Sequence, residues 1–305
     1  MPKKNLNPIQ MIYAYDGSFE GFLSCVFESF KSKEMPQDII SVQEEQIPLL
    51  PSFKVKTESD KADRVVKSIL KNFGYEIFFF IQNGFLSCLE HKEIILLEFF
   101  HKIYKDKRII KDISDNTVLT LTKAVENLIG EAHLFKGFVR FSMHKDILIA
   151  SIKPKNFVLH ILIRYFIERL PNENFLIYDE GRKIAAVYNK AGFAEFKDEQ
   201  NNQNINSGAK IGGIEDSLNG LNGRELTAKT ANSKTKLKGG YIISEINLPS
   251  NVENEETLYK DLWKKFYKTI AIKERENLKL RQNLMPKRYW ENLTEMEQEL
   301  KKVRY

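Results

Sequence analysis

Short apolar runs and helix-type spacing alternate along the first part of the chain. MIYAY at 11–15 is a continuous apolar run of strand length, and the Asp-Gly pair after it favours a turn. Ser18 then stands where a helix cap is expected, and apolar residues recur behind it at three- and four-residue spacing. The pattern therefore predicts a strand, a turn and a helix, and FKVK at 53–56 indicates a second strand.

Helical spacing dominates the following stretch, where apolar residues return on one face of each predicted helix. The predicted helices lie at 58–73, 75–88, 89–106 and 116–134. Apart from the short strands near its start, the first half of the chain is therefore expected to be largely α-helical.

The pattern changes to strand type at Lys136. Two apolar or alternating runs joined by a polar link indicate a hairpin, and a second pair of runs around EGR indicates another. An amphipathic helix is predicted between the two pairs, at 158–170. The predicted strands lie at 137–141, 147–152, 174–179, 183–188 and 241–249. The order ββαββ predicts a small antiparallel sheet with one helix packed on a face.

The end of the chain is predicted to be helical again. Asn254 caps an amphipathic helix, Pro286 starts a short one, and a capping box at Thr294 begins a last, charged one. The fold class is therefore α+β: a largely helical N-terminal half with a strand-turn-helix start, then a small antiparallel ββαββ unit and C-terminal helices.

Two domains are predicted, at 1–135 and 136–305. The stretch 200–240 is rich in Asn, holds seven of the fifteen glycines and has almost no aromatic residues. Such a stretch buries too little apolar surface to offset the entropy of ordering it. We therefore expect a flexible insertion at 200–240, inside the second domain.

Composition supports a globular chain outside that insertion. Hydrophobic residues make up 42%, with 21 phenylalanines, which is enough apolar material for a core. No run of eighteen apolar residues is present, so no membrane span or membrane partner is expected. The N-terminus lacks the apolar region of a secretory signal, and Cys25 and Cys88 have no disulfide or metal spacing. The expected location is cytoplasmic.

Motifs for common cofactors are absent from the sequence. It contains no P-loop and no GxSxG turn, and its glycine-rich stretch does not follow a strand. Glu98 and His101 form a single ExxH pair, whereas carboxylate-bridged di-iron bundles need two. The sequence therefore predicts neither a cofactor nor a metal, and we expect Glu98 and His101 at the solvent-exposed edge of their helix.

Basic residues concentrate near the C-terminus. The net charge is +6, yet Trp263 to Arg288 alone hold nine basic and two acidic residues, and nine minus two is +7. Basic side chains bind phosphates, so this region is the best candidate for nucleic-acid contact. The candidate DNA-binding residues are Lys260, Lys264, Lys268, Arg275, Arg281, Lys287 and Arg288, together with Arg140 and Arg182. In MPKRYW we expect Trp290 to be buried and Lys287 and Arg288 to be exposed.

A second set of polar residues offers an enzymatic interpretation. Tyr15 and Asp16 lie at the end of the first strand, where strand ends often line a pocket, but a capped strand-to-helix turn is the favoured explanation of them. His133 is a candidate general base, and Asp179 either serves a site or completes a turn with Arg182. These four residues, Tyr15, Asp16, His133 and Asp179, are weak catalytic candidates.

Four motifs in order carry a resemblance over almost the whole chain: YDGSFEGFL, EAHLFKGFVRF, FLIYDEGR and the long segment ending in MPKRYWENLTE. Together they resemble a bacterial family of uncharacterised proteins described as DNA metabolism or DNA repair proteins. The resemblance implies a radical-SAM partner, because the family is typically encoded beside a radical-SAM protein that looks like a DNA modification or repair enzyme. Some members continue into a uracil-DNA-glycosylase-like domain, which we expect to be absent here.

Three hypotheses follow. The first is a DNA-binding accessory factor that acts with the radical-SAM enzyme on DNA. The second is an enzyme that acts on a nucleotide or base through Tyr15, Asp16, His133 and Asp179. The third is a non-catalytic interaction module whose basic face meets an acidic protein.

Overall fold

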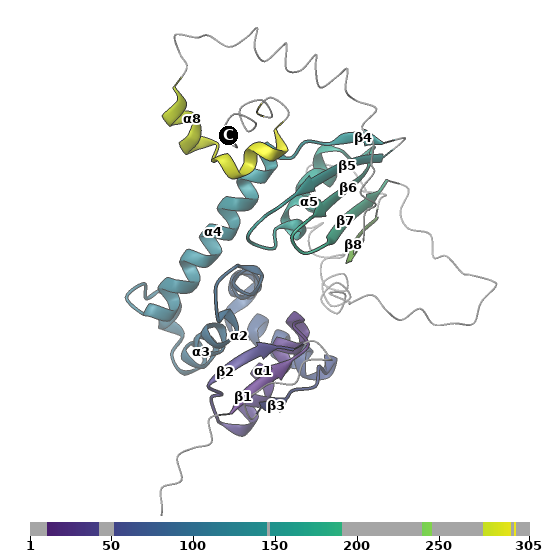
Figure 1. The fold of residues 1–305 in the computed structure, drawn as a ribbon. Helices are drawn as coiled ribbons and strands as arrows, with labels where there is room; N and C mark the ends of the chain where they lie inside the picture. Colours follow the sequence, from purple (N-terminus) through teal and green to yellow (C-terminus); the bar gives the residue numbers. More distant parts are fainter. Residues whose placement is uncertain are drawn as a thin grey trace, which may run out of the picture. The chain divides into compact units, whose positions relative to one another are not determined.

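The computed structural model describes residues 11–42, 52–144, 147–190, 240–245, 277–293 and 296. Contacts between residues divide the chain into two compact units. Unit 1 comprises the described residues up to Ile129 together with Lys155–Phe157, and unit 2 comprises Gly130–Pro154 and the described residues from Val158 onward. Both strands and helices are present (Figure 1), so the predicted α+β class is confirmed. The predicted helix after Asn254, the last helix and nearly all of the insertion lie outside the described residues.

Unit 1 opens with the predicted strand, turn and helix. Strand β1 (Ile12–Tyr15) is wholly buried, and helix α1 (Phe19–Ser32) follows it. Gly17 has a φ of 84°, a conformation that favours glycine, and this allows the tight turn. The Ser18 side chain accepts a hydrogen bond of 2.9 Å from the Gly21 amide, which confirms the predicted cap.

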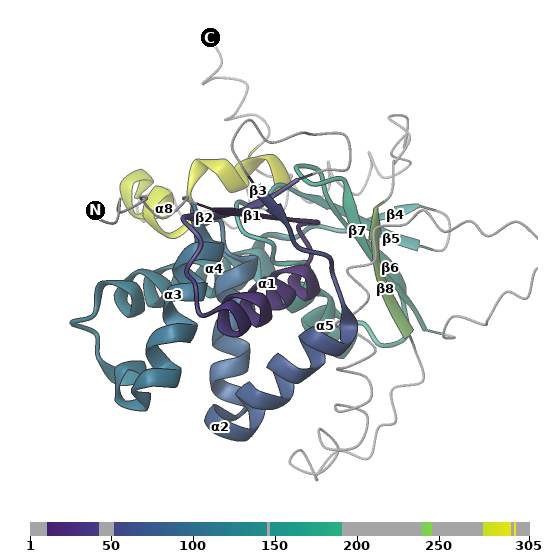
Figure 2. The same ribbon diagram turned by 90° about the horizontal axis from the view of Figure 1, so that it is seen from below.

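Strand β1 is the centre of a three-stranded parallel sheet with the order β2-β1-β3. Strand β3 (Ser52–Lys54) overlaps the second strand predicted at 53–56, but β2 (Asp38–Ser41) was not predicted. Only Ile39 of β2 is buried, so its four residues give too short an apolar signal. Figure 2 shows the helices α1, α2 and α3 on the same side of this sheet.

The remaining helices of unit 1 are α2 (Ser59–Leu86), α3 (Lys92–Lys105), the 3₁₀ helix η1 (Lys107–Lys111) and the start of α4 (Asn116–Phe138). Gly74 interrupts α2 with a φ of 82°, where the sequence predicted a break between two helices. Phenylalanines supply much of the core, and the centroids of their contacting rings lie 5.1 to 6.4 Å apart. The buried rings of this cluster are Phe19, Phe22, Phe78, Phe85, Phe99 and Phe100.

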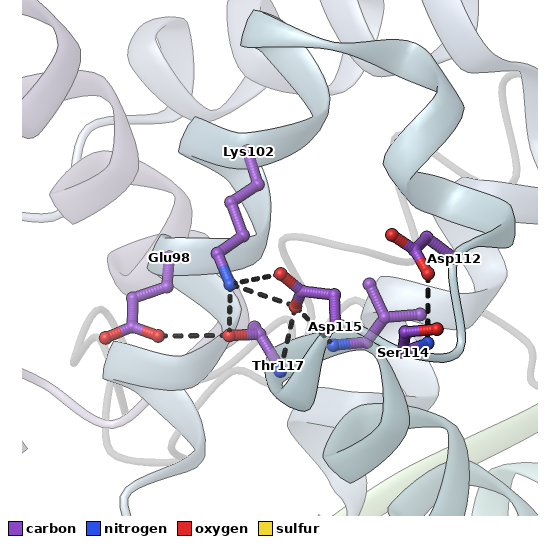
Figure 3. A network of polar contacts seen from close by, with 7 residues as sticks. Glu98, Lys102, Asp112, Ser114, Asp115 and Thr117 are labelled. Atoms are coloured by element: carbon purple, nitrogen blue, oxygen red, sulfur yellow. Dashed lines mark hydrogen bonds and ion pairs between the residues drawn. The ribbon is translucent and has the colours of Figure 1, made fainter.

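A polar network joins α3 to the start of α4 (Figure 3). Asp115 precedes α4, and its carboxylate accepts hydrogen bonds from the amides of Thr117 (2.9 Å) and Val118 (3.2 Å). The Lys102 ammonium lies 2.7 Å from the same carboxylate and also donates to the Thr117 hydroxyl. Asp115 therefore caps one helix and pairs with a cation of another.

Unit 2 contains a five-stranded sheet with the order β4-β5-β6-β7-β8, in which α5 (Leu159–Arg169) packs against β6, β7 and β8. The strands are β4 (Ser142–His144), β5 (Ile147–Ile152), β6 (Asn174–Asp179), β7 (Ile184–Asn189) and β8 (Gly240–Glu245). The predicted antiparallel sheet was wrong at its centre, because β5 and β6 are parallel. Helix α5 connects these two adjacent strands, and a helical crossover returns the chain in the same direction.

The predicted strand at 137–141 was also wrong. Helix α4 continues to Phe138, because Phe135 and Val139 extend its buried stripe by one more turn. Strand β4 consequently begins only at Ser142 and pairs with β5 in the predicted antiparallel sense. At the far edge of the sheet, β8 pairs with β7 so that Gly240 stands opposite Asn189. None of the helices in the described ranges has the length and apolar character that a membrane span requires.

The double role of Asp115 gives a pH-dependent prediction. Lys102 holds the pKa of Asp115 below its usual value, so the stabilisation is complete above the unfolded-state pKa and is lost as pH falls through the folded-state pKa. We expect Asp115→Ala to lower the free energy of unfolding by about 1–2 kcal/mol at neutral pH, mainly through the lost cap. Urea unfolding near neutrality and at about pH 3 should show this difference shrinking on acidification.

Asp112→Ala is the matched control, because Asp112 also precedes a turn but accepts only from the Ser114 amide among the contacts in Figure 3. Its effect on the free energy of unfolding should be smaller, and it should not show the Lys102-dependent decrease on acidification. A difference between wild type and Asp115→Ala that is constant over pH would contradict the ion pair.

Candidate nucleic-acid interface

The described part of the basic C-terminal region is a short helix followed by a 3₁₀ helix. Helix α8 (Leu278–Leu284) is capped by the Asn277 side chain, which accepts from the Leu280 amide at 2.9 Å. Met285 ends α8, and η3 (Lys287–Asn292) follows Pro286. Figure 1 shows this yellow segment against the C-terminal end of α4. We call 277–293 the C-terminal segment.

Aromatic side chains anchor the C-terminal segment. Tyr289 and Trp290 are only 1% and 2% exposed, so the predicted burial of Trp290 is confirmed. The Tyr289 ring meets the rings of Phe135 and Phe138 of α4, with centroids 5.0 and 5.2 Å apart. The indole Nε1 of Trp290 donates to the Met285 carbonyl at 2.9 Å, so its polar atom is satisfied inside. The segment is therefore fixed by a small core of its own.

Arg288 connects this core to a buried carboxylate. Its Nη2 lies 3.3 Å from Oε1 of Glu131 on α4, and the Glu131 side chain is only 2% exposed. The Arg288 guanidinium also lies over the Tyr289 ring, 4.5 Å from the centroid, and donates to the Tyr289 hydroxyl. Burial raises the pKa of that hydroxyl, and the Arg288 charge opposes the rise. Arg288 is exposed as predicted, at 42% of its side chain, but it also holds the segment in place.

The exposed side of the C-terminal segment carries several cationic residues. Lys279 and Lys287 are exposed and form no ion pair with any residue that the structure describes. Arg281 is half-buried, and its guanidinium lies 5.6 Å from the centre of the Trp290 ring. Of the predicted DNA-binding residues, the structure thus brings Arg281, Lys287 and Arg288 together. Lys260, Lys264, Lys268 and Arg275 lie outside the described residues.

Arg140 and Arg182 are the two candidates from other parts of unit 2. Arg140 donates to the carbonyls of Gly137 and Val139 at the end of α4, where a cation complements the helix dipole. Arg182 lies 2.9 Å from the buried Asp179 carboxylate and donates to the Pro154 carbonyl. Both guanidinium groups thus form contacts within unit 2, and their contact with DNA stays a prediction.

The catalytic candidates are divided between the two units. In unit 1 the buried Tyr15 hydroxyl donates to Glu93 at 2.9 Å, and burial raises the pKa of Tyr15 strongly. The Asp16 carboxylate accepts from the amide and hydroxyl of Ser18 and from the hydroxyl of Thr57, so it braces the turn after β1. These are the contacts of a structural turn.

The other two candidates lie in unit 2. His133 is an exposed residue of α4. Asp179 is fully buried at the end of β6 and accepts from the amides of Gly181 and Arg182, which confirms its pairing in the hairpin turn. A catalytic role for Tyr15, Asp16, His133 and Asp179 stays a prediction.

Glu98 and His101 on α3 form the ExxH pair that was considered as a source of metal ligands. Glu98 accepts from the Thr117 hydroxyl at 3.2 Å (Figure 3), whereas the His101 ring stacks on Phe30 at 4.3 Å and its Nε2 lies 2.9 Å from the Ser29 hydroxyl. Burial lowers the pKa of His101. Within the described ranges, no cluster of three or more His, Cys, Asp or Glu side chains suits a metal ion.

Sequence reasoning did not identify Glu131 as the partner of Arg288. Its position carried a usable signal, because Glu131 falls on the buried stripe of α4 between Leu128 and Phe135. A carboxylate on a buried stripe requires a cation or several donors, since an unpaired buried charge is costly. The sequence thus indicates that Glu131 needs a cationic partner, but it does not show which of the many basic residues is that partner.

Comparisons with known proteins identify a family and a weak likeness to a solved structure. A family model described as a domain of unknown function, DUF4130, matches residues 90–295, which is more than half of the chain. No curated protein matches the sequence. Among solved structures, a pGpG-specific phosphodiesterase from Vibrio cholerae aligns with 12% identity, 58% of this chain, 80% of that chain and a TM-score of 0.28. A likeness this weak carries no argument about fold or function.

Substitutions of Trp290 and Arg288 should show how strongly each side chain anchors the C-terminal segment. We expect Trp290→Ala to cost about 3–5 kcal/mol of stability, because it empties a buried aromatic site. Arg288→Ala should cost about 1–3 kcal/mol, because Glu131 stays buried without this cation, and partial exposure of the guanidinium moderates the loss. Thermal and urea unfolding measure both changes.

A double-mutant cycle isolates the ion pair. Adding Glu131→Gln to Arg288→Ala should recover part of the lost stability, because the buried charge that Arg288 balanced is removed. If Arg288→Ala unfolds at the same urea concentration as wild type, the pair does not hold the segment.

Proposed function

The chain belongs to the DUF4130 family, whose domain has no known function, and from this premise we propose that it is a DNA-binding protein of DNA repair or DNA metabolism. The observation that supports the proposal is the two-sided C-terminal segment, with aromatic rings inside and Lys279 and Lys287 outside. Because buried aromatic residues already anchor the backbone of the segment, a phosphate contact restricts only the lysine side chain that makes it. The resemblance of MPKRYW and three other motifs to an uncharacterised family described as DNA metabolism or DNA repair proteins supports the same setting.

The charge of the segment suits a polyanion. The sequence from 277 to 293 holds four cations, Lys279, Arg281, Lys287 and Arg288, and one acid, Glu291, and four minus one is +3. Each phosphate that a cation neutralises releases a condensed counterion, so binding by this surface must weaken with salt. Such contacts position a protein on DNA and carry no base information.

The proposal also includes a radical-SAM enzyme as partner, supported by the resemblance alone. In this scheme the chain holds DNA while the partner performs the chemistry.

Salt dependence tests the DNA contact. Lys279→Ala with Lys287→Ala should lower the slope of log affinity against log salt by about 1 to 2, because up to two phosphate contacts are lost. The change should be alike for duplexes of different sequence. Fluorescence anisotropy over a salt series measures the slope, and stability should barely change because both lysines are exposed.

Lys105→Ala with Lys111→Ala is the matched control, since it removes the same charge at exposed positions of unit 1. An equal decrease in both double variants would mean that net charge alone attracts DNA. Absence of salt-dependent binding by the wild type at physiological salt would remove the DNA proposal in favour of an interaction module.

Co-purification tests the partner. Tagged full-length chain should retain the radical-SAM enzyme after nuclease treatment if the two proteins bind directly. Loss of the enzyme on nuclease treatment would mean that DNA bridges them, and its absence in both conditions would remove the partner from the proposal.

A further inference from the structure

Two large leucines are exposed on α8. Leu280 and Leu284 have 53% and 67% of their surface in contact with water. Their spacing of four residues places them on one ridge of the helix, one turn apart. A single exposed leucine is ordinary, but an exposed pair on one ridge forms a continuous apolar edge.

The exposed residues beside the two leucines in the sequence are cationic or carry side-chain amides. Lys279, Gln282, Asn283 and Lys287 are exposed, and these are cationic or amide side chains. The ridge is also held rigidly, because the Asn277 cap fixes one end of α8 and the Trp290 indole is bonded to the Met285 carbonyl at the other. The apolar edge therefore projects from a braced, positively charged element.

This combination matches the chemistry of the minor groove of duplex DNA. Lysine, arginine, asparagine and glutamine contact the groove floor and phosphates, and an apolar wedge enters between neighbouring base pairs. The net charge of +3 on 277–293, from four cations and one acid, complements the phosphates on either side of a groove. Phosphate contact alone would leave the leucines without a role, and insertion between bases buries them.

We propose that α8 binds duplex DNA with Leu280 and Leu284 as a wedge that unstacks a base step. The inference rests on the proposed DNA binding and specifies the ligand as a deformable duplex. Unstacking costs a few kcal/mol and costs least where a base pair is mismatched or a step is flexible. The chain therefore binds a mismatched duplex more tightly than a fully paired one.

The experiment uses full-length protein and a short duplex that carries 2-aminopurine at its centre, in a paired and a mismatched form. Binding should raise 2-aminopurine fluorescence, because the base loses its stacked neighbour. Leu280→Ala with Leu284→Ala should abolish the rise and bring the ratio of mismatched to paired affinity close to one. The salt slope should stay at the wild-type value, because no charge is removed.

Two further variants complete the test. Leu280→Met with Leu284→Met should restore the fluorescence rise, since methionine also serves as a wedge. Ile113→Ala, an exposed apolar residue of unit 1, should leave both readouts unchanged. All of these positions are exposed, so thermal unfolding should show intact proteins.

The outcomes separate the two proposals. Salt-dependent binding by the wild type with no fluorescence rise and no mismatch preference would overturn the wedge and leave DNA binding standing. A fluorescence rise that survives in the double alanine variant would also overturn it. If the leucine ridge binds an acidic protein instead, the wild type shows no salt-dependent DNA binding, and both proposals fail together.

Discussion

A carboxylate inside a protein must be neutralised, and in this chain Glu131 is neutralised by a residue far along the sequence. Arg288 reaches it from the C-terminal segment, and the same guanidinium covers the Tyr289 ring. Removing one member of such a pair is costly because the other stays desolvated. The pair therefore fixes where the C-terminal segment lies on unit 2, and with it the direction in which Lys279, Lys287 and the leucine ridge project.

Neighbouring basic residues of the C-terminal segment therefore have different roles. The Arg288 guanidinium pairs with a buried carboxylate and lies over an aromatic ring, whereas the side chain of Lys287, next to it in the sequence, is exposed to solvent. Arginine suits the first task because its planar group both stacks and donates, and lysine suits the second because it is a compact charge on a flexible stem. A basic run in a sequence is therefore not a uniform surface, and each cation has to be assigned by what it contacts.

The sequence predicted most elements whose signal is local. The β1 strand, the Ser18 cap, strands β5 to β8 and helix α5 follow from apolar runs, spacing and a short polar side chain beside an amide. Features that depend on distant partners were missed or wrong: β2 is stabilised by its neighbour β1, and the parallel pairing of β5 with β6 depends on α5. The same limit applies to the site, because burial of Trp290 could be predicted whereas the partner of Glu131 could not.

The register at the far edge of the five-stranded sheet has a practical consequence. Asn189 and Gly240 face each other across β7 and β8, so the ladder itself joins the two ends of the connection between them. The entropy of closing a connection grows only slowly with its length, by about 0.6 kcal/mol for each doubling. The connection between β7 and β8 is thus a suitable position for inserting additional sequence. A fluorophore-bearing peptide or an affinity tag inserted there should leave the register of the sheet unchanged.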